Sequence, residues 1–280
     1  MTGSHDTRAA RVHRLIPASP STDMPSRAPA STPHDKTTIV SMAVVAHGLA
    51  TLLHEGVGHG VVAWLRGDTV TELTSNHLSS LRPDGWVQAG GTLVNALVGI
   101  VSMLAASRST RANSRYFLWL FGALNLLPAA GYFLLSGIAG FGDWHEVTKD
   151  LPRQSLVRIV MAVCGAVAYY LVVRWLANGA RPFVATPSEY NAVGRLPYYT
   201  AGAFSILAGA FDPLGLELLF MSTIPAAFGG LSGLMWADSL MPSTANASLR
   251  ITPARAWWFI AALFGVTYVV ILGRGVSFAQ

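Results

Sequence analysis

The chain has 280 residues, of which 52% are hydrophobic and only 12% are Asp, Glu, Lys or Arg, against roughly 25% charged residues in a soluble globular domain. This composition excludes an ordinary soluble domain and predicts an all-α, polytopic membrane protein. The net charge of +5 does not indicate a nucleic-acid partner, because Lys and Arg of membrane proteins gather in cytoplasmic loops. The single cysteine, Cys164, excludes a disulfide framework and a cysteine-rich metal site.

Residues 1–37 are rich in Pro, Ser, Ala and Thr and have no apolar period, which predicts a disordered N-terminal arm. We expect no secretory signal peptide, because no short apolar stretch with a small-residue cleavage site follows the positive segment. The Lys and Arg count of the loops places the N-terminus in the cytoplasm.

Long apolar segments follow the arm, each close to the ~20 residues that a helix needs to cross the hydrocarbon core. They are 39–65, 86–106, 116–141, 155–177, much of 198–236, and 256–273. We therefore expect about six transmembrane helices, within a range of five to seven. The segment 198–236 is interrupted by "FDPLGLE", which predicts a broken helix or a tight pair of helices.

The first apolar segment contains "ATLLHEGVGHGVVAWLRG", and its titratable residues are His47, His54, Glu55 and His59. Such groups at membrane depth are costly and usually functional. In the zinc motif H-E-x-x-H, the four-residue spacing points both imidazoles at one metal ion and leaves the glutamate beside it. Here His54 and His59 are five residues apart, which separates them by about 140° on a regular helix.

A π-bulge would absorb the inserted residue, because its i→i+5 hydrogen bonds bring residues five apart into line. Glycines within the motif make this distortion cheap, so we predict an over-wide or broken helix between Leu52 and Gly60. The alternative is that Glu55 and His59, which are four apart, are the ligands and that His54 is a bystander.

The order of motifs resembles the site-2 protease family of intramembrane zinc metalloproteases. A membrane helix with an H-E…G-H motif is followed by a polar loop, then by "AGGTLVNALVGI" and by "GALNLLPAAGY". Asn95 matches the asparagine of the family's Gly-Pro-x-x-Asn-like signature, and Thr92 stands where proline is common. Asn125 to Pro128 matches the family's N-x-x-P.

The family's third zinc ligand is an aspartate that falls at Phe133 in this chain. The next carboxylate is Asp143, ten positions further along, and we assign the ligand role to it. Glycines between the motif and Asp143 would let the chain bend back. The other residues that could substitute are His145, Glu146, Asp212 and Glu217.

The resemblance implies a zinc-dependent intramembrane metalloendopeptidase that hydrolyses membrane-embedded protein substrates. His54, His59 and Asp143 would hold Zn²⁺, and Glu55 would be the general base. Asn95 or Asn125 would stabilise the oxyanion or position the substrate. His47 is either a packed histidine or a residue that orients one of the metal ligands.

Residues 68–86 begin with strand-like alternation, so they either add a strand to an unwound substrate or form a surface loop. The resemblance covers about residues 40–146, which gives a metalloprotease core at 38–146 and further transmembrane helices of unrecognised type at 147–280. It also leaves the membrane orientation open, because the family usually turns the loop after the metal helix towards the cytoplasm. We expect a multi-pass protein of the bacterial inner (plasma) membrane.

The six-residue H-E-x-x-G-H form also resembles the motif of the soluble dipeptidyl-peptidase III family, where both histidines bind zinc. That resemblance covers only these six residues and indicates that the spacing is tolerable. A membrane di-iron desaturase is excluded because the remaining histidines are scattered singly. A transporter or a proteolytically inactive membrane scaffold with a metal site is the alternative function, since Asp212, Pro213 and Glu217 are typical of a discontinuous helix.

Overall fold

The computed structural model describes residues 1–3, 33–241 and 247–278, and residues Pro33–Gln280 form one compact unit. Most of the predicted N-terminal arm lies outside the described residues. Its last residues are ordered, because Asp35 Oδ1 accepts a hydrogen bond from Thr38 N at 2.8 Å and caps helix α1, which begins at Lys36. The arm predicted for residues 1–37 therefore ends a few residues earlier than its composition indicates.

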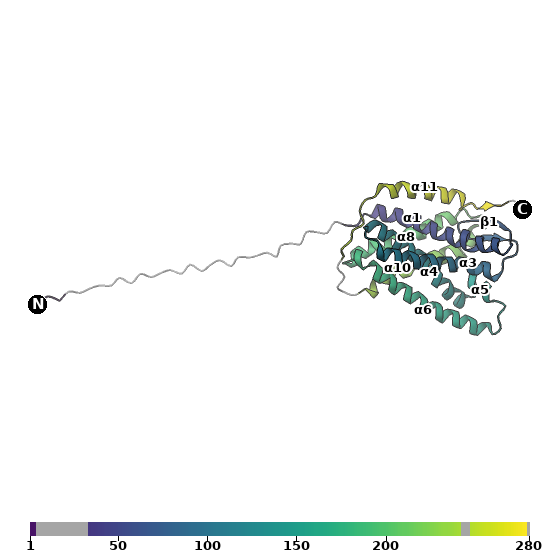
Figure 1. Cartoon of the computed structure of the whole chain (residues 1–280), viewed down its shortest axis with the longest axis horizontal. Helices are drawn as coiled ribbons and strands as arrows, with labels where there is room; N and C mark the ends of the chain where they lie inside the picture. The colour runs from purple at the N-terminus through teal and green to yellow at the C-terminus, as the bar shows by residue number, and fades with distance from the viewer. Residues whose placement is uncertain (4–32, 242–246, 279–280) are drawn as a thin grey trace. The chain divides into compact units, whose positions relative to one another are not determined.

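Long helices make up most of this unit, and they run side by side (Figure 1). The first is α1 (Lys36–Leu52), which continues without a break into η1 (Leu53–Val61) and α2 (Val62–Leu65). The others are α3 (Gly85–Arg108), α4 (Ala112–Ala139), α6 (Gln154–Ala180) and α11 (Arg255–Ile271).

Within the described residues, five helices are long and apolar enough to cross a membrane, as expected of a multi-pass membrane protein. They are Lys36–Leu65, Gly85–Arg108, Ala112–Ala139, Gln154–Phe183 and Gly215–Leu240. The predicted segment at 256–273 forms α11, which is apolar but has only 17 residues. The count is thus at the lower end of the predicted range.

The segment 198–236 forms a pair of helices rather than one. Helix α8 (Leu196–Gly209) ends before the predicted interruption, and α9 (Gly215–Leu218) begins within it at Gly215, whose φ is 76°. The chain then continues through η4 (Leu219–Thr223), η5 (Pro225–Gly230), α10 (Gly233–Trp236) and η6 (Ala237–Leu240). Between α6 and α8 lie η2 (Arg181–Phe183), α7 (Pro187–Tyr190) and η3 (Asn191–Arg195).

The strand-like alternation at 68–86 forms an antiparallel hairpin of β1 (Val70–Leu73) and β2 (Leu78–Ser80). A third strand near the C-terminus, β3 (Val276–Ser277), pairs with the other side of β1. The strand order is β2-β1-β3, so β1 has a neighbour on each side, and no other described strand pairs with the second edge of β2. Figure 1 places β1, α5 (Asp143–Thr148) and the end of α11 at the same end of the helix bundle.

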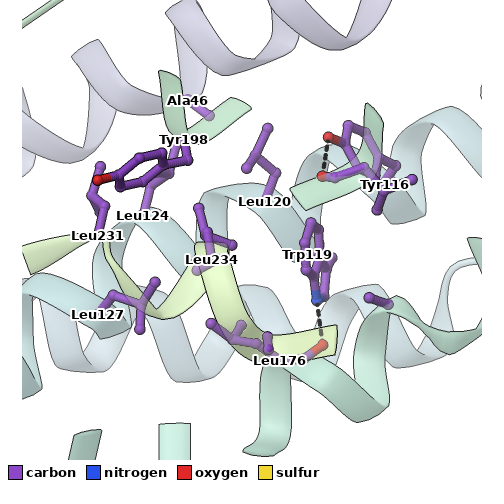
Figure 2. Close-up of a cluster of buried hydrophobic side chains, with 14 of the residues drawn as sticks. Ala46, Tyr116, Trp119, Leu120, Leu124, Leu127, Leu176, Tyr198, Leu231 and Leu234 are labelled. Atoms are coloured by element: carbon purple, nitrogen blue, oxygen red, sulfur yellow. Dashed lines mark hydrogen bonds between the residues drawn. The ribbon is translucent and has the colours of Figure 1, made fainter. Parts of the chain in front are cut away.

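One buried core joins the segments 38–146 and 147–280. Trp119 of α4 donates a hydrogen bond from Nε1 to the carbonyl of Leu176 in α6 at 3.0 Å (Figure 2). Tyr116 donates from its hydroxyl to the carbonyl of Val193 in η3 at 2.9 Å. Leu231 and other apolar residues of the C-terminal half pack into the same cluster. The two predicted parts are therefore built around a shared core, which fixes α4 between the first helices and the C-terminal ones.

Candidate metal centre

The helix that carries the histidine motif is over-wide, as its spacing predicts. Residues Leu53–Val61 form a π-helix of nine residues. The rings of His54 and His59 converge, with centroids 4.8 Å apart and ring planes at 88°. The extra residue of H-E-x-x-G-H is thus absorbed by the wider turn, which brings the two imidazoles to the same side of the helix.

Close packing against α3 supports this wide turn. Gly58 lies so near α3 that a Cβ at this position would overlap the Cα of Gly91. A Cβ at Gly90 would overlap the carbonyl of Gly58 in turn. Glycines on both helices therefore allow backbone to touch backbone, and this contact places the first turns of α3 beside the two histidines.

The two imidazoles are buried, and each is held by a neighbour. His59 Nδ1 donates a hydrogen bond to the carbonyl of Val87 at 2.7 Å, which leaves the lone pair of its Nε2 free to bind a metal. The ring of His54 stacks on Tyr132 of α4, with centroids 5.3 Å apart and planes at 16°. His54 Nδ1 is buried without a hydrogen-bond partner among the described residues.

Asp143 reaches the same place from α4 by way of a sharp turn. Helix α4 ends at Ala139, and the chain reverses at Gly140 and Gly142, whose φ angles are 72° and 91°. Phe133 occupies the position at which the family resemblance implies an aspartate. Its ring packs on Trp144 at 4.3 Å between centroids. This contact holds the short helix α5, which begins with Asp143, against α4.

The Asp143 carboxylate lies between the two imidazoles. Its Oδ2 is 3.3 Å from His54 Nε2 and 3.9 Å from His59 Nε2, and Thr92 Oγ1 donates a hydrogen bond to it at 3.3 Å. Burial by itself would raise the pKa of Asp143, but His54, His59 and the hydroxyl of Thr92 together hold this pKa below its ordinary value. Asp143 is therefore available as an anionic ligand.

His54, His59 and Asp143 could hold a metal ion, since their ligand atoms all lie within 4.8 Å of one another, and we name this candidate site the metal-binding group. Ligand atoms that share a tetrahedral ion at ~2.0–2.1 Å are about 3.4 Å apart, so the separations of Asp143 from both histidines fit such an ion. A Cβ at Gly91 would lie 2.7 Å from both Nε2 atoms, and glycine thus leaves the space between the imidazoles free.

Glu55 stands next to this group without belonging to it. Its Oε2 lies 3.8 Å from His59 Nε2, and the residue is 6% exposed. The alternative in which Glu55 and His59 bind while His54 is a bystander is not favoured, because His54 Nε2 is the nitrogen nearest to Asp143.

Two cavities meet at Glu55. The larger, of about 390 Å³, is lined by the metal-binding group and by β2. The smaller, of about 90 Å³, lies on the side of α1 and α8 and is lined by His47, Asn95 and Ser205 among others. A carboxylate between two cavities is accessible to small molecules that enter from either side.

The remaining predicted site residues have different environments. Asn95 is buried, lines the smaller cavity with Glu55, and its Oδ1 has no partner among the described residues. Asn125 donates from Nδ2 to the carbonyl of Phe121 in its own helix and is absent from the walls of both cavities. His47 Nε2 hydrogen-bonds Ser205 Oγ at 2.5 Å, so it is held by α8 rather than by the metal-binding group.

The substitute ligands do not join the group. Glu146 pairs with Lys149 at 2.8 Å, and Asp212 contacts the β1–β2 hairpin. Glu217 is exposed on α9, and His145 lies on α5 two residues after Asp143, outside the convergent set.

Sequence reasoning assigned no role to three residues that shape the site: Gly91, Thr92 and Tyr132. The string "AGGT" contained the first two, and its signal is a pair of glycines in a membrane helix, which is typical of close helix packing. Tyr132 adjoins Phe133, the position of the expected aspartate. Its stacking on His54 has no signature in the spacing of the sequence.

Comparison of the chain with protein-family models, curated proteins and solved structures gives no match in any of the three. The functional interpretation therefore depends on the geometry of the site and on the motif resemblance.

Proposed function

We propose that the protein is a zinc-dependent intramembrane metalloendopeptidase that hydrolyses peptide bonds of membrane-embedded proteins. The observation that carries this proposal is the convergence of His54, His59 and Asp143 beside Glu55 within an apolar helix. Two imidazoles and one carboxylate are a ligand set of hydrolytic zinc sites, which keep a further position open for water.

Zinc, when held by these three residues, supplies a Lewis acid that polarises water and the scissile carbonyl. Glu55 is the group that accepts the proton from the attacking water and returns it to the leaving amine. It is suited to this role because it lies 3.8 Å from His59 Nε2 and borders both cavities. Asn95 lines the smaller cavity and is the better placed of the two asparagines to donate a hydrogen bond to the developing oxyanion.

The walls of the larger cavity support the proposed substrate class. The residues of β2, Leu78–Ser80, line this cavity, and one edge of β2 has no partner strand within the part of the chain that the structure describes. An unwound segment of a substrate could pair with that edge and lie across Glu55, as in other cases of strand addition. The site is near one end of the bundle, so we place the reaction close to one surface of the membrane, and we propose the bacterial inner membrane as the location.

The test measures zinc content and cleavage in the wild type and in one variant whose substituted side chain has the same shape. Glu55→Gln removes the base and leaves the three ligands in place. We expect about one zinc per chain in both proteins, and a loss of cleavage of a reconstituted transmembrane substrate by about 10²-fold or more. Glu217→Gln is the matched control, because Glu217 is exposed on α9, and it should cleave as the wild type does.

Two results would contradict the proposal. One is purified protein without stoichiometric zinc, and the other is Glu55→Gln that cleaves normally. A wild type that binds zinc but cleaves no transmembrane substrate would favour the alternative of an inactive scaffold or transporter.

A further inference from the structure

Asp212 is a buried carboxylate that the metal-binding group does not use. It lies in the turn between α8 and α9, and its side chain is 0% exposed. Its Oδ2 accepts a hydrogen bond from Asn76 Nδ2 at 3.1 Å and lies 3.5 Å from His77 Nδ1. Its Oδ1 accepts from the backbone N–H of Leu214 at 3.0 Å. The carboxylate is therefore satisfied mainly by the tip of the β1–β2 hairpin.

The hairpin tip, residues 74–77, has further bonds to the C-terminal half. Thr223 of η4 donates from Oγ1 to Asn76 Oδ1 at 3.1 Å. The backbone N–H of Ser75 donates to the carbonyl of Leu272, just after α11, at 2.8 Å. Three separate elements of the C-terminal half thus fix a tip that belongs to the loop after the metal helix.

The same tip adjoins both cavities at Glu55. Asn76 lines the larger cavity and the smaller one, and His77 lines the larger cavity together with β2. Because β2 begins directly after His77, at Leu78, a displacement of the tip would shift the free strand edge relative to Glu55 and the metal-binding group.

Burial of a charged carboxylate is unfavourable unless hydrogen bonds compensate for the lost hydration. Asn76 and Leu214 supply such bonds, and His77 adds a polar contact. The ring of His77 also contacts Glu72, whose Oε2 is 3.4 Å from His77 Nε2. A bond to a charged acceptor is stronger and more directional than a neutral one. This makes Asp212 suited to hold the tip in one position.

We propose that Asp212 and Asn76 form a clamp through which the C-terminal half positions β2 beside the metal-binding group. Asp212 is a positioning residue under this proposal. It holds β2 in the place where the strand of a membrane-embedded substrate would pair. The inference rests on the proposed peptidase function for its effect on substrate, but the clamp itself can be measured without cleavage.

The test exchanges the two side chains across the contact. Asp212→Asn alone places an amide group against the amide of Asn76, and Asn76→Asp alone places two carboxylates together. The double variant, Asp212→Asn with Asn76→Asp, restores a donor opposite an acceptor, and its new carboxylate can still accept from Thr223. Such a cycle separates the pair interaction from general damage to the fold.

Each variant is made with Ser79→Cys and Cys164→Ala, so that β2 carries the single thiol. We expect both single variants to raise the rate of maleimide labelling at position 79, and the double variant to return it to the parent value. The KM for a reconstituted transmembrane substrate should rise about tenfold in the single variants, the effect of losing one bond to a charged group. The kcat and the zinc content should stay near the parent values.

Equal labelling in the single variants and their parent would overturn the clamp, whatever the cleavage result. Raised labelling with an unchanged KM, or a fall in kcat instead, would overturn the positioning role. Failure of the double variant to restore labelling would show that the singles act through misfolding. A parent protein that cleaves nothing contradicts the peptidase function, and the labelling rates then still decide whether the clamp exists.

Discussion

Besides η3, two π-helical regions occur in the described part of the chain, and they differ in the side chains that their widened turns carry. The first is η1 (Leu53–Val61), and the second is the pair η4 and η5 (Leu219–Thr223 and Pro225–Gly230). Both interrupt helices that are apolar enough to cross a membrane. Only η1 contains histidines and a glutamate, whereas the second region contains no titratable side chain.

Their packing differs as much as their chemistry. Gly58 of η1 is packed against Gly91, with no room for a Cβ, whereas no described residue has a heavy atom within 4 Å of a Cβ at Gly229 or Gly230. The wide turns of η1 therefore hold the two imidazoles in place because α3 packs directly against them. In η5 the open surroundings leave Pro225 and Ala226 as small residues in the wall of the larger cavity. A π-turn by itself is thus insufficient for a metal site.

Among the changes that test this difference between the two regions, deletion of Val57 should have the largest effect, a loss of bound zinc. It restores the H-E-x-x-H spacing, but the structure supports the wider turn, so the chain would rotate one histidine away from Asp143. We expect the zinc content to fall from about one ion per chain to less than a tenth of that, since structural support of the ligands is lost. The measurement is metal analysis of the purified protein.

Deletion of Gly229 is the matched control, because it shortens the other π-helical region where no ligand depends on the register. It should leave the zinc content unchanged. A Val57 deletion that bound zinc as well as the wild type would contradict the bulge-built site and favour a regular helix at the motif.

The second prediction concerns the space between the imidazoles. Gly91→Ala would place a Cβ 2.7 Å from Nε2 of both His54 and His59, closer than such contacts occur, so the two rings must separate. We expect the zinc dissociation constant to rise by about 10–100-fold, the range seen when the support of metal ligands is altered. Competition with a zinc chelator measures this value.

Gly230→Ala adds the same methyl group in the other π-helical region, where the space is open, and should not change zinc binding. Equal dissociation constants for the two variants would mean that the ion does not lie between the rings.

The sequence predicted the first π-helix because two histidines had to be brought into phase and glycines surrounded them. It did not predict the second, because a π-turn without ligands leaves no mismatch in the spacing. The turn that delivers Asp143 was predictable from Gly140 and Gly142, which favour positive φ. The contact between Phe133 and Trp144, which holds this turn in place, was not predictable from the sequence.

The hairpin shows a similar limit. The alternation in 68–86 predicted strands, and β1 and β2 are close enough in sequence for their pairing to have a local signal. The pairing of β1 with β3, about two hundred residues later, has no local signal because β3 has only two residues. The role of Asp212 depends in the same way on contacts with Asn76 that only the folded chain reveals.

The third prediction, with the smallest expected effect, concerns the pH dependence of stability. It compares the buried His34 with His54 and His59. His54 and His59 each present Nε2 to Asp143, whereas both nitrogens of His34 bind backbone: Nε2 lies 2.7 Å from the carbonyl of Phe183, and Nδ1 accepts from Ile251 N at 3.2 Å. Only neutral imidazole can donate at one nitrogen and accept at the other.

Burial lowers the pKa of His34, and the nearby Arg250 lowers it further, although the bond to Phe183 opposes this. A group whose pKa is lower in the folded state stabilises the fold above its unfolded pKa, here about 6.5, and loses that contribution as the pH falls below it. We expect the wild type to lose more stability between pH 7 and pH 5 than His34→Gln does, as measured by the melting temperature at each pH. Glutamine can replace both bonds and does not titrate, so melting curves with identical pH dependence in the two proteins would mean that His34 is not held neutral by the fold.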